Sequence, residues 1–444
     1  MRDDLLTPAE MALADDAAAK LGCPTALLME NAGRAVARAI RARFAPCRTL
    51  ALCGPGNNGG DGRVAARLLA EAGWPVTVAA LGSARFTAAE AARAELVIDA
   101  VFGAGLARDV APDVADVLRA ARRVVAIDVP SGLDGGTGAV RGYAPQAVLT
   151  VTFHRFKPGH FLLPGRELCG EAVLADIGLP EAATPAVATF RNTPRLWAIP
   201  HPTASGHKYS RGHATVLGGA AMTGAARMAA VAARRAGAGL VTIAAIEGAV
   251  IYRAGEPGTI VDEHSIADQL ADTRRNAWLC GPGLGADAAR AALPVLLASG
   301  RDVVVDADGL TVCAGAPERL RGAAVLTPHA GEFARVFGPP GADRLTAARA
   351  AAALTGAVVA LKGADTIVAA PNGRAAINDN APPWLATAGS GDVLAGVVTG
   401  LLAQGMPAWD AACAAVWVHG RAGALAGRGL IAEDLLRHLA RAHL

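Results

Sequence analysis

Residues 54–62 read Gly-Pro-Gly-Asn-Asn-Gly-Gly-Asp-Gly, and this stretch constrains the fold more than any other. The apolar run 50–53 precedes it, and residues 63–70 follow it with helical spacing. The pattern predicts a strand, a glycine-dense turn and a helix, in that order. Such a turn directs backbone N–H groups and a helix N-terminus at an anion, usually a phosphate. A tight turn with an Asn or Asp helix cap is the alternative, but it does not need five glycines.

The same alternation of strand and helix continues through both halves of the chain. In the first half, apolar runs rich in branched residues predict strands at 75–81, 95–99, 123–128 and 148–152. In the second half, strands are expected at 214–218, 240–244, 278–280, 303–306, 325–326 and 358–361, with helices from 392 onward. Alanine-rich helical stretches between such runs are typical of parallel sheets. The proline-rich, aperiodic segment 180–205 is the expected linker between domains 1–190 and 191–444.

Composition narrows the class of protein. Hydrophobic residues make up 52% of the chain but aromatic ones only 4%, which favours helices packed on parallel sheets over an all-β fold. The net charge of +3 comes without a basic run, so we expect no nucleic-acid partner. No stretch approaches the ~20 apolar residues of a membrane span, so no membrane partner is expected. Seven scattered cysteines without a CxxC pair favour reduced thiols and a cytoplasmic enzyme. Alanine-rich helical faces lead us to expect a homo-oligomer.

Two aspartates close predicted strands in the first half. Asp99 ends Leu-Val-Ile-Asp, Asp128 ends Val-Ala-Ile-Asp, and a glycine-containing loop follows each. Because the carboxyl ends of parallel strands face one edge, we expect both acids and residues 54–62 to share one crevice. A lone aspartate at a strand end is as often a helix cap or a loop acid. Two at equivalent strand ends favour a functional site.

The second half carries a sharper constellation. Residues 387–392 (Thr-Ala-Gly-Ser-Gly-Asp) open an apolar helix, where glycines let the backbone surround an oxyanion and the helix dipole stabilises its charge. Asp392 stands beside that hole and can accept a proton from a hydroxyl that attacks a phosphoryl group. A glycine turn with an aspartate cap would explain this motif alone. Four more turn and strand-end motifs accompany it and together favour a nucleotide site: 281–285, 305–308, 326–332 and 361–366.

These motifs carry a family resemblance. Gly218-Gly219, Gly-Pro-Gly-Leu-Gly, Val-Asp-Ala-Asp, Leu-Thr-Pro-His-Ala-Gly-Glu, Lys-Gly-Ala-Asp-Thr and Gly-Ser-Gly-Asp follow one another as in the ribokinase-like NAD(P)H-hydrate dehydratase family, which the second half resembles. With residues 54–62, 99–106 and 127–134, the first half resembles NAD(P)H-hydrate epimerase domains. The resemblance covers nearly the whole chain. It implies an α/β protein with an N-terminal Rossmann-like three-layer α/β/α domain followed by a ribokinase-like α/β domain.

The resemblance also implies what the chain does. A bifunctional repair enzyme of this kind interconverts the R and S forms of hydrated NADH and NADPH. It then dehydrates the S form back to NAD(P)H at the expense of ADP, giving AMP and phosphate. The implied partners are therefore the hydrates, NADHX and NADPHX, and ADP. Asp128 is expected to shuttle a proton in the first reaction, and Asp392 to act as the base in the second, with Mg²⁺ at the dehydratase site.

In the epimerase-like half, the resemblance implies hydrate contacts along two loops and at one strand end: Asn57, Asn58, Gly59, Gly60, Asp61, Gly103, Ala104, Gly105, Leu106, Ala107, Arg108, Asp109 and Asp128. Asn58, Asp99 and Ser131 match the potassium ligands of the family. Asp99 and Asp128 should also repel each other unless a cation lies between them. No lysine lies in the three loops that carry Asn58, Asp99 and Ser131. We therefore expect the cation to be a bound K⁺.

In the dehydratase-like half, Ala225, Gly283, His329 and Asp392 match hydrate-contacting positions. The adenine nucleotide is expected at Lys362, Gly363, Ala364, Asp365, Thr366 and Gly391. Two other functions stay open from sequence: a ribokinase-like vitamin kinase in the second half, and a non-catalytic nucleotide-binding module in the first. We interpret His419 and the remaining histidines as structural or surface residues.

Overall fold

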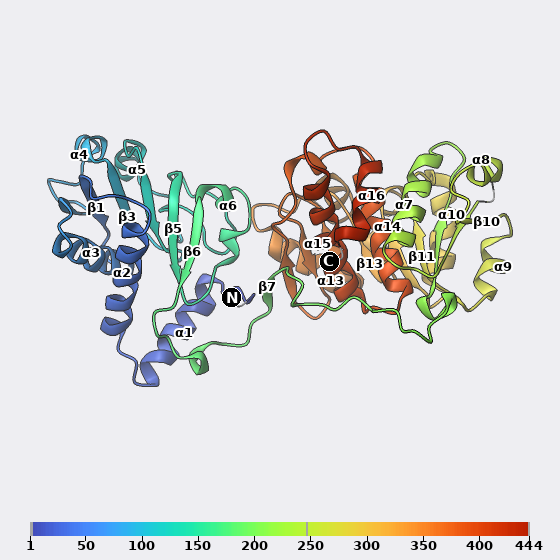
Figure 1. Ribbon diagram of the computed structural model, residues 1–444, viewed down its shortest axis with the longest axis horizontal. Coiled ribbons are helices and arrows are strands. Elements are labelled where there is room, and N and C mark those ends of the chain that lie inside the picture. The colour runs from blue at the N-terminus through green and yellow to red at the C-terminus, as the bar shows by residue number, and fades with distance from the viewer. Residues whose placement is uncertain (1–2, 246, 443–444) are drawn as a thin grey trace. The chain divides into compact units, whose positions relative to one another are not determined.

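The computed structural model describes residues 3–245 and 247–442. The chain forms two compact units, Met1–Thr189 and Phe190–Leu444. Each unit is built on its own sheet (Figure 1). Among the described residues, no helix has the length and apolar character that a membrane crossing requires.

Unit 1 contains a six-stranded parallel sheet in the order β2-β1-β3-β4-β5-β6. The first five strands along the chain lie at the predicted apolar runs, and the sixth was not predicted. The strands are β1 (Thr49–Cys53), β2 (Val76–Ala80), β3 (Leu96–Ala100), β4 (Val124–Ile127), β5 (Ala147–Phe153) and β6 (Glu171–Ala175). The order reverses direction beside β1, and parallel sheets place ligand crevices at such points, outside the carboxyl ends of the strands.

Helices cover both faces of this sheet, as the three-layer prediction requires. Alternate residues of one strand face opposite layers: Ala51 and Cys53 join the core beneath one set of helices, and Leu50 and Leu52 join the core beneath the other. The first set is α1 (Pro8–Lys20), α2 (Thr25–Arg41) and α3 (Asn57–Glu71), and the second is α4 (Ala88–Arg93) and α5 (Pro112–Arg119). A short helix, α6 (Gly165–Leu168), precedes β6.

The glycine-dense stretch differs from the predicted turn. Helix α3 begins at Asn57, so most of the stretch forms its first turns, with Gly56 as the N-cap. The glycines serve close packing: a Cβ at Gly59 would lie 1.9 Å from the carbonyl oxygen of Gly54, and one at Gly62 would lie 2.4 Å from the Cβ of Ala100. The start of α3 is therefore pressed against the end of β1, and its first residues lie at the crevice.

Unit 2 contains a ten-stranded sheet in the order β10-β9-β8-β11-β12-β13-β14-β15-β16-β7. The seven strands from β10 to β14 are parallel, and β14, β15 and β16 pair antiparallel. Their bounds are β7 (Thr189–Arg191), β8 (His213–Leu217), β9 (Leu240–Ala244), β10 (Ile260–Asp262), β11 (Arg275–Cys280), β12 (Asp302–Val305), β13 (Val325–Leu326), β14 (Val358–Leu361), β15 (Ile367–Ala369) and β16 (Ala375–Ile377). The predicted α/β class is confirmed for both units.

Small residues bring the helices of unit 2 close together. A Cβ at Gly396 would lie 2.2 Å from the carbonyl oxygen of Ala229, so α14 and α7 touch backbone to backbone. The helices of the unit are α7 (Thr223–Arg235), α8 (Ala249–Arg253), α9 (Ile266–Ala271), α10 (Ala286–Leu297), α11 (Ala307–Thr311), α12 (Ala330–Phe337), α13 (Arg344–Thr355), α14 (Ser390–Ala403), α15 (Ala408–Ala426) and α16 (Ala432–Ala442). This packing explains the alanine content, and it fixes the start of α14 at the sheet edge.

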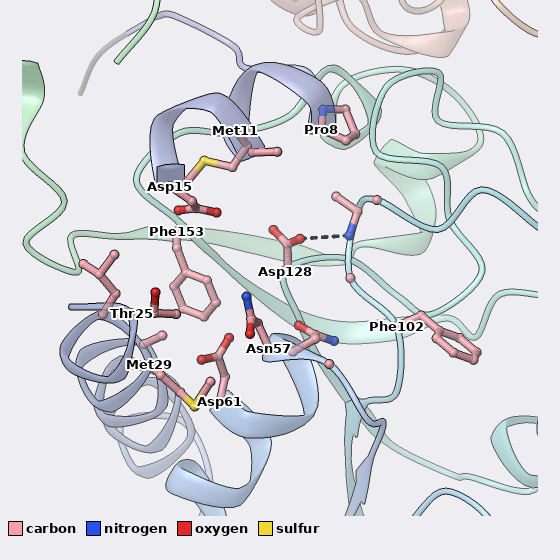
Figure 2. Close-up of a pocket in the computed structure, with 18 of the residues that line it drawn as sticks. Pro8, Met11, Asp15, Thr25, Met29, Asn57, Asp61, Phe102, Asp128 and Phe153 are labelled. Atoms are coloured by element: carbon pink, nitrogen blue, oxygen red, sulfur yellow. Dashed lines mark hydrogen bonds between the residues drawn. The ribbon is translucent and has the colours of Figure 1, made fainter. Parts of the chain in front are cut away.

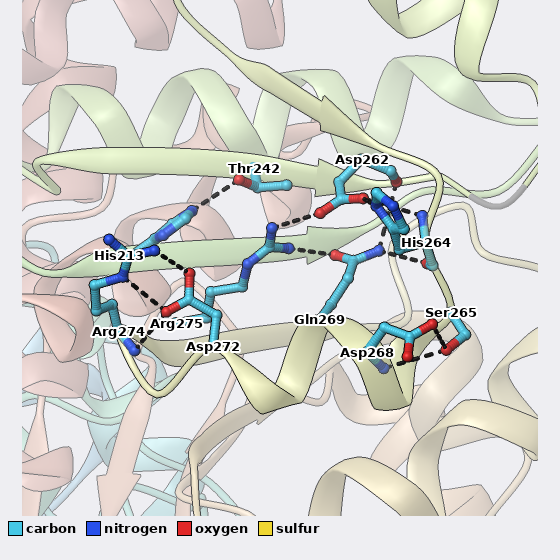
Figure 3. A network of polar contacts seen from close by, with 10 residues as sticks. All are labelled: His213, Thr242, Asp262, His264, Ser265, Asp268, Gln269, Asp272, Arg274 and Arg275. Carbon is cyan, nitrogen blue, oxygen red and sulfur yellow. Dashed lines mark hydrogen bonds and ion pairs between the residues drawn. The ribbon is translucent and has the colours of Figure 1, made fainter.

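A polar network holds the β10 edge of this sheet (Figure 3). The Arg275 guanidinium on β11 donates to Asp262 on β10 at 2.5 Å and also to the side chain of Gln269 on α9. Nearby, the imidazole Nε2 of His213 lies 2.7 Å from the Thr242 hydroxyl, and burial lowers the pKa of His213 to about 4. The histidine is therefore neutral and structural, as its sequence context indicated.

Candidate active sites

A cavity of about 720 Å³ opens at the carboxyl ends of the unit 1 strands. Figure 2 shows side chains from α1, α2, α3 and the strand ends directed into it. The structure brings together nine of the predicted hydrate contacts in its lining: Asn57, Asn58, Asp61, Gly103, Ala104, Gly105, Leu106, Arg108 and Asp128. Four predicted contacts do not line the cavity: Gly59 and Gly60 in α3, and Ala107 and Asp109 in the loop after β3.

Asp128 occupies the centre of this site in a left-handed backbone conformation, with φ of 67°. Its Oδ2 accepts from the backbone N–H of Ala104 at 2.9 Å, and its Oδ1 accepts from the Thr152 hydroxyl at 2.9 Å. The Lys157 ammonium lies 2.7 Å from Oδ1. Burial alone would raise the pKa of Asp128, but the Lys157 charge and these hydrogen bonds outweigh it and lower the pKa to about 2. Asp128 is thus a permanent carboxylate at neutral pH.

Lys157 was missed by the sequence reasoning, and it corrects one argument. We expected Asp128 to need a bound cation because no lysine lies in the three motif loops; the positive charge instead comes from Lys157, which follows β5. Its side chain is 3% exposed. His160 fixes the segment: its Nδ1 accepts from the Lys157 backbone N–H at 2.9 Å, and its Nε2 lies 2.8 Å from the Asp128 carbonyl oxygen. Lys157 lies outside the sequence motifs, and it reaches Asp128 only because β5 pairs with β4. Its role could therefore not be predicted from the motifs.

Asp99, near the end of β3, is fully buried and does not line the cavity. Ser131 donates to it twice, from its backbone N–H at 2.8 Å and from its hydroxyl at 2.6 Å, so these two predicted ligands are in contact. Burial raises the pKa of Asp99, because none of its contacts among the described residues is a cationic group. The third predicted ligand, Asn58, lines the cavity, and its buried side-chain Nδ2 has no partner among the described residues.

A second carboxyl group in the cavity has a raised pKa, whereas the pKa of Asp128 is lowered. Asp61, on the first turns of α3, is 9% exposed. Burial, with added repulsion from Asp128 and Asp15, raises the pKa of Asp61 to about 8. At neutral pH this side chain is mostly a protonated acid. Of the four aspartates that line the cavity, Asp128 is therefore ionised and Asp61 mostly protonated, and burial raises the pKa of Asp15 as well.

In unit 2, Asp392 lies in the first turn of α14, as predicted. Gly389 caps the helix in a left-handed conformation with φ of 85°, which favours glycine. Burial and the neighbouring Asp306 raise the pKa of Asp392 to about 6, although Lys362 opposes the shift. A carboxyl group with this pKa can exchange protons near neutral pH.

Lys362 neutralises the carboxylates that surround Asp392. Its ammonium lies 2.9 Å from Asp306 and 3.8 Å from Glu332. Burial alone would lower the pKa of Lys362, but Asp306, Glu332 and Asp392 together raise it, so the lysine stays charged. Glu332 also accepts from the backbone N–H of His329 at 2.8 Å, which fixes the start of α12 beside the site.

A cavity of about 420 Å³ lies beside α14. Six predicted contacts line it: His329, Lys362, Gly363, Ala364, Thr366 and Gly391. Asp365 does not line the cavity, because its carboxylate is buried and bonds to Arg344 at 2.6 Å. The predicted nucleotide contact at Asp365 stays a prediction.

Three predicted hydrate contacts of unit 2, Asp392, Ala225 and Gly283, do not line this cavity, and the last two lie against each other. A Cβ at Gly283 would be 3.0 Å from the Cβ of Ala225. The sequence reasoning did not select Ser390, whose hydroxyl lies in the cavity wall 3.1 Å from Nε2 of His419. Burial lowers the pKa of His419 to about 4, so it is neutral and holds Ser390 in place.

Two α/β units, each with a cavity beside a lysine–aspartate ion pair, define a protein with two small-molecule sites. Two known domain families match the chain: "YjeF-related protein N-terminus" over residues 25–92 and 82–159, and "NAD(P)H-hydrate dehydratase" over residues 214–442.

Relatives match across both units. The bifunctional NAD(P)H-hydrate repair enzyme Nnr of Moorella thermoacetica is 37% identical, with 98% of this chain and 96% of the relative covered. The enzyme of the same name from Mycobacterium tuberculosis (strain H37Rv) is 39% identical over 82% of this chain and 80% of its own length. Among solved structures, the ADP/ATP-dependent NAD(P)H-hydrate dehydratase of Bacillus subtilis, co-crystallised with ATP and Mg²⁺, is 28% identical with a TM-score of 0.49, covering 56% of this chain and 94% of that one. The chain belongs to the family of bifunctional NAD(P)H-hydrate repair enzymes, so the predicted resemblance is confirmed.

Proposed function

We propose that the chain repairs hydrated NADH and NADPH in two steps, with unit 1 as the epimerase and unit 2 as the dehydratase. The observation that carries this proposal is the full-length match to bifunctional repair enzymes, combined with a candidate acid–base residue in each unit. The substrates have a hydroxyl group on carbon six of the nicotinamide ring, next to the ring nitrogen. Such a carbinolamine exists as two epimers, R and S.

In unit 1, the Asp128 carboxylate is the proposed base. Lys157 keeps it ionised, and the N–H of Ala104 holds its other oxygen, so the group is oriented before the substrate binds. The proposed hydrate contacts are the cavity residues of α3 and of the loop after β3. By accepting the hydroxyl proton, Asp128 would allow the carbinolamine to open and re-form with either configuration.

The residues around Asp99 fit a monovalent cation. The Asp99 carboxyl group has no cationic contact among the described residues, and the Ser131 hydroxyl lies 2.6 Å from it. With the side-chain carbonyl of Asn58, these groups would offer oxygen ligands. K⁺ bound there would supply the missing positive charge. We propose Asn58, Asp99 and Ser131 as its ligands, with Asp99 the dominant one.

In unit 2, Asp392 is the proposed base that deprotonates the hydroxyl of the S hydrate for attack on the terminal phosphate of ADP. The backbone N–H groups at the start of α14 would stabilise the phosphoryl charge, and Lys362 would contact the nucleotide together with Gly363, Ala364, Thr366 and Gly391. The phosphorylated hydroxyl then leaves, which restores NAD(P)H. Mg²⁺ held by the nucleotide phosphates would add positive charge where the phosphoryl group is transferred.

The test uses the full chain and two matched variants, Asp128→Asn and Asp392→Asn. Mixed hydrate epimers are incubated with ADP and separately with ATP, and NADH recovery is followed by absorbance. The wild-type protein should recover both epimers, Asp128→Asn should recover only one quickly, and Asp392→Asn should recover neither while still equilibrating the two. Recovery by Asp392→Asn at the wild-type rate would contradict the proposal. The homo-oligomeric state and the cytoplasmic location stay predictions.

A further inference from the structure

The carboxyl group of Asp61 is buried in the unit 1 cavity without a partner. The side chain is 9% exposed and lines the cavity, yet it makes no hydrogen bond or ion pair among the described residues. Asp128, in the same cavity, has contacts from Ala104, Thr152 and Lys157. Buried polar groups are normally satisfied, so an unpartnered carboxyl group aimed into a cavity indicates a group reserved for a ligand.

The charges around the cavity keep Asp61 protonated. The titratable and charged side chains that line it are Asp15 and Asp16 from α1, Arg108 from the loop after β3, Asp128 after β4 and Lys157 after β5. Lys157 is bonded to Asp128 and Thr152 and is not paired with Asp61. Repulsion from Asp128 and Asp15, added to burial, therefore leaves Asp61 as the neutral acid.

Figure 2 shows the Asp61 and Asp128 side chains entering the same space from different elements, Asp61 from α3 and Asp128 from the end of β4. Lys157 keeps Asp128 ionised, whereas Asp61, which has no partner among the described residues, stays protonated. Environments that separate the pKa values of two titratable groups assign one as the acid and the other as the base.

We propose that Asp61 is a second catalytic residue of the epimerase site and acts as the general acid opposite Asp128, the general base. This inference rests on the proposed epimerase function of unit 1. It gives Asp61 a role in the chemical step, beyond contact with the substrate.

The reaction balances without any other reactant. Asp128 accepts the proton of the hydroxyl on carbon six, the oxygen electron pair forms a carbonyl, and the bond between carbon six and the ring nitrogen breaks. Asp61 gives its proton to that nitrogen, which receives the bonding pair. Rotation about the bond between carbons five and six presents the other face of the aldehyde. Ring closure then reverses both proton transfers: Asp128 returns its proton to the carbonyl oxygen, Asp61 takes its proton back from the nitrogen, and the opposite epimer is formed with both aspartates in their starting states.

The test compares Asp61→Asn with wild type in the full chain. Asparagine has the same shape but cannot transfer a proton, so kcat for epimerisation should fall on the order of a hundredfold, while KM stays within about threefold of wild type. In the wild-type protein, kcat/KM should fall as the pH rises through the pKa of Asp61, and Asp61→Asn should lose that basic limb. Asp113→Asn, an exposed acid on α5 away from the cavity, serves as the matched control and should match wild type.

Dehydration of the S epimer by the same variant reports folding, because unit 2 carries that reaction, and it should be unchanged. Near-normal kcat in Asp61→Asn would overturn the inference, as would a raised KM with the basic limb intact, since either result gives Asp61 a binding role only. If wild type itself did not accelerate epimerisation above the rate without protein, the proposed function of unit 1 would fail and this inference with it. If wild type did and Asp61→Asn equalled it, only this inference would fail.

Discussion

Replacing Lys157 with methionine should destabilise unit 1 far more than an ordinary lysine substitution. Lys157 and Asp128 form a buried ion pair at 2.7 Å, with side chains 3% and 18% exposed. Lys157 also donates to the Thr152 hydroxyl at 2.9 Å. Methionine keeps the volume of the aliphatic stem, so the change removes the charge and the hydrogen bonds with little loss of packing.

The size of the destabilisation follows from the Asp128 charge that is left without a partner. Removing one partner of a buried ion pair costs about 3–5 kcal/mol, because the other charge is left uncompensated. For a domain of this size, 1 kcal/mol shifts Tm by roughly 2–4 °C, so the transition of unit 1 should fall by roughly 6–20 °C at pH 7. The matched control is Lys20→Met at the exposed end of α1, which should cost less than about 1 kcal/mol.

The stability that Lys157→Met loses should also depend on pH, and the sign of that dependence follows from the pKa of Asp128. In wild type, the pKa of folded Asp128 is about 2, below the unfolded value near 3.8, so the pair stabilises above pH 3.8 and this stability is lost as the pH falls through 2. In Lys157→Met, burial raises the pKa of Asp128 instead, so the carboxyl group takes up a proton as the pH falls. The variant's deficit is therefore largest at neutral pH and shrinks toward about pH 4.

Calorimetry of the full chain at pH 7 and near pH 4 measures these shifts, and hydrogen exchange in β4 and β5 assigns the affected transition to unit 1. The double variant Lys157→Met, Asp128→Asn should recover much of the loss, because no buried charge is left unpaired. An unchanged unit 1 transition in Lys157→Met would refute the reasoning, as would a double variant less stable than the sum of the single changes.

Three further outcomes are expected. With Asp392 as the base, kcat/KM for dehydration should rise as the pH rises through about 6, and Asp392→Asn should lower kcat on the order of a hundredfold while ADP affinity by calorimetry changes little. Asp99→Ala should weaken epimerisation and leave dehydration of the S epimer intact, and wild-type crystals soaked in rubidium should give an anomalous peak beside Asp99. Arg275→Met should cost unit 2 about 3 kcal/mol, because the side chain is 11% exposed and holds Asp262. By contrast, Arg274→Met, whose ion pair with Asp272 is exposed, should cost at most about 1 kcal/mol.

The strand positions and the crevice at one sheet edge could be predicted from sequence, because both follow from local patterns. Apolar runs placed β3 and β4, and parallel topology then brought Asp99 and Asp128 to the same edge. The same logic placed Asp392 in the first turn of a helix. In each case the residue belongs to the motif that predicts it.

Lys157 and the protonation of Asp61 could not be predicted, because each depends on residues distant in sequence. The partner of Asp128 lies 29 positions later and reaches it only because β5 pairs with β4. The neutral state of Asp61 depends on burial by α1 and α2 and on the nearby Asp128 charge. The glycines of residues 54–62 allow α3 to approach the end of β1 closely. Hydrophobic periodicity does not predict such a close backbone contact.

The two sites share one electrostatic arrangement on unrelated sheets. In unit 1, Lys157 is bonded to Asp128, and burial together with repulsion from Asp128 and Asp15 raises the pKa of Asp61 to about 8. In unit 2, Lys362 is bonded to Asp306, and the neighbouring Asp392 has a pKa raised to about 6. In each unit a lysine is paired with one carboxylate, and a second carboxyl group nearby has a raised pKa. A basic side chain bonded directly to Asp61 or Asp392 would lower that pKa, so each proposed proton transfer depends on that carboxyl group having no ion-pair partner of its own.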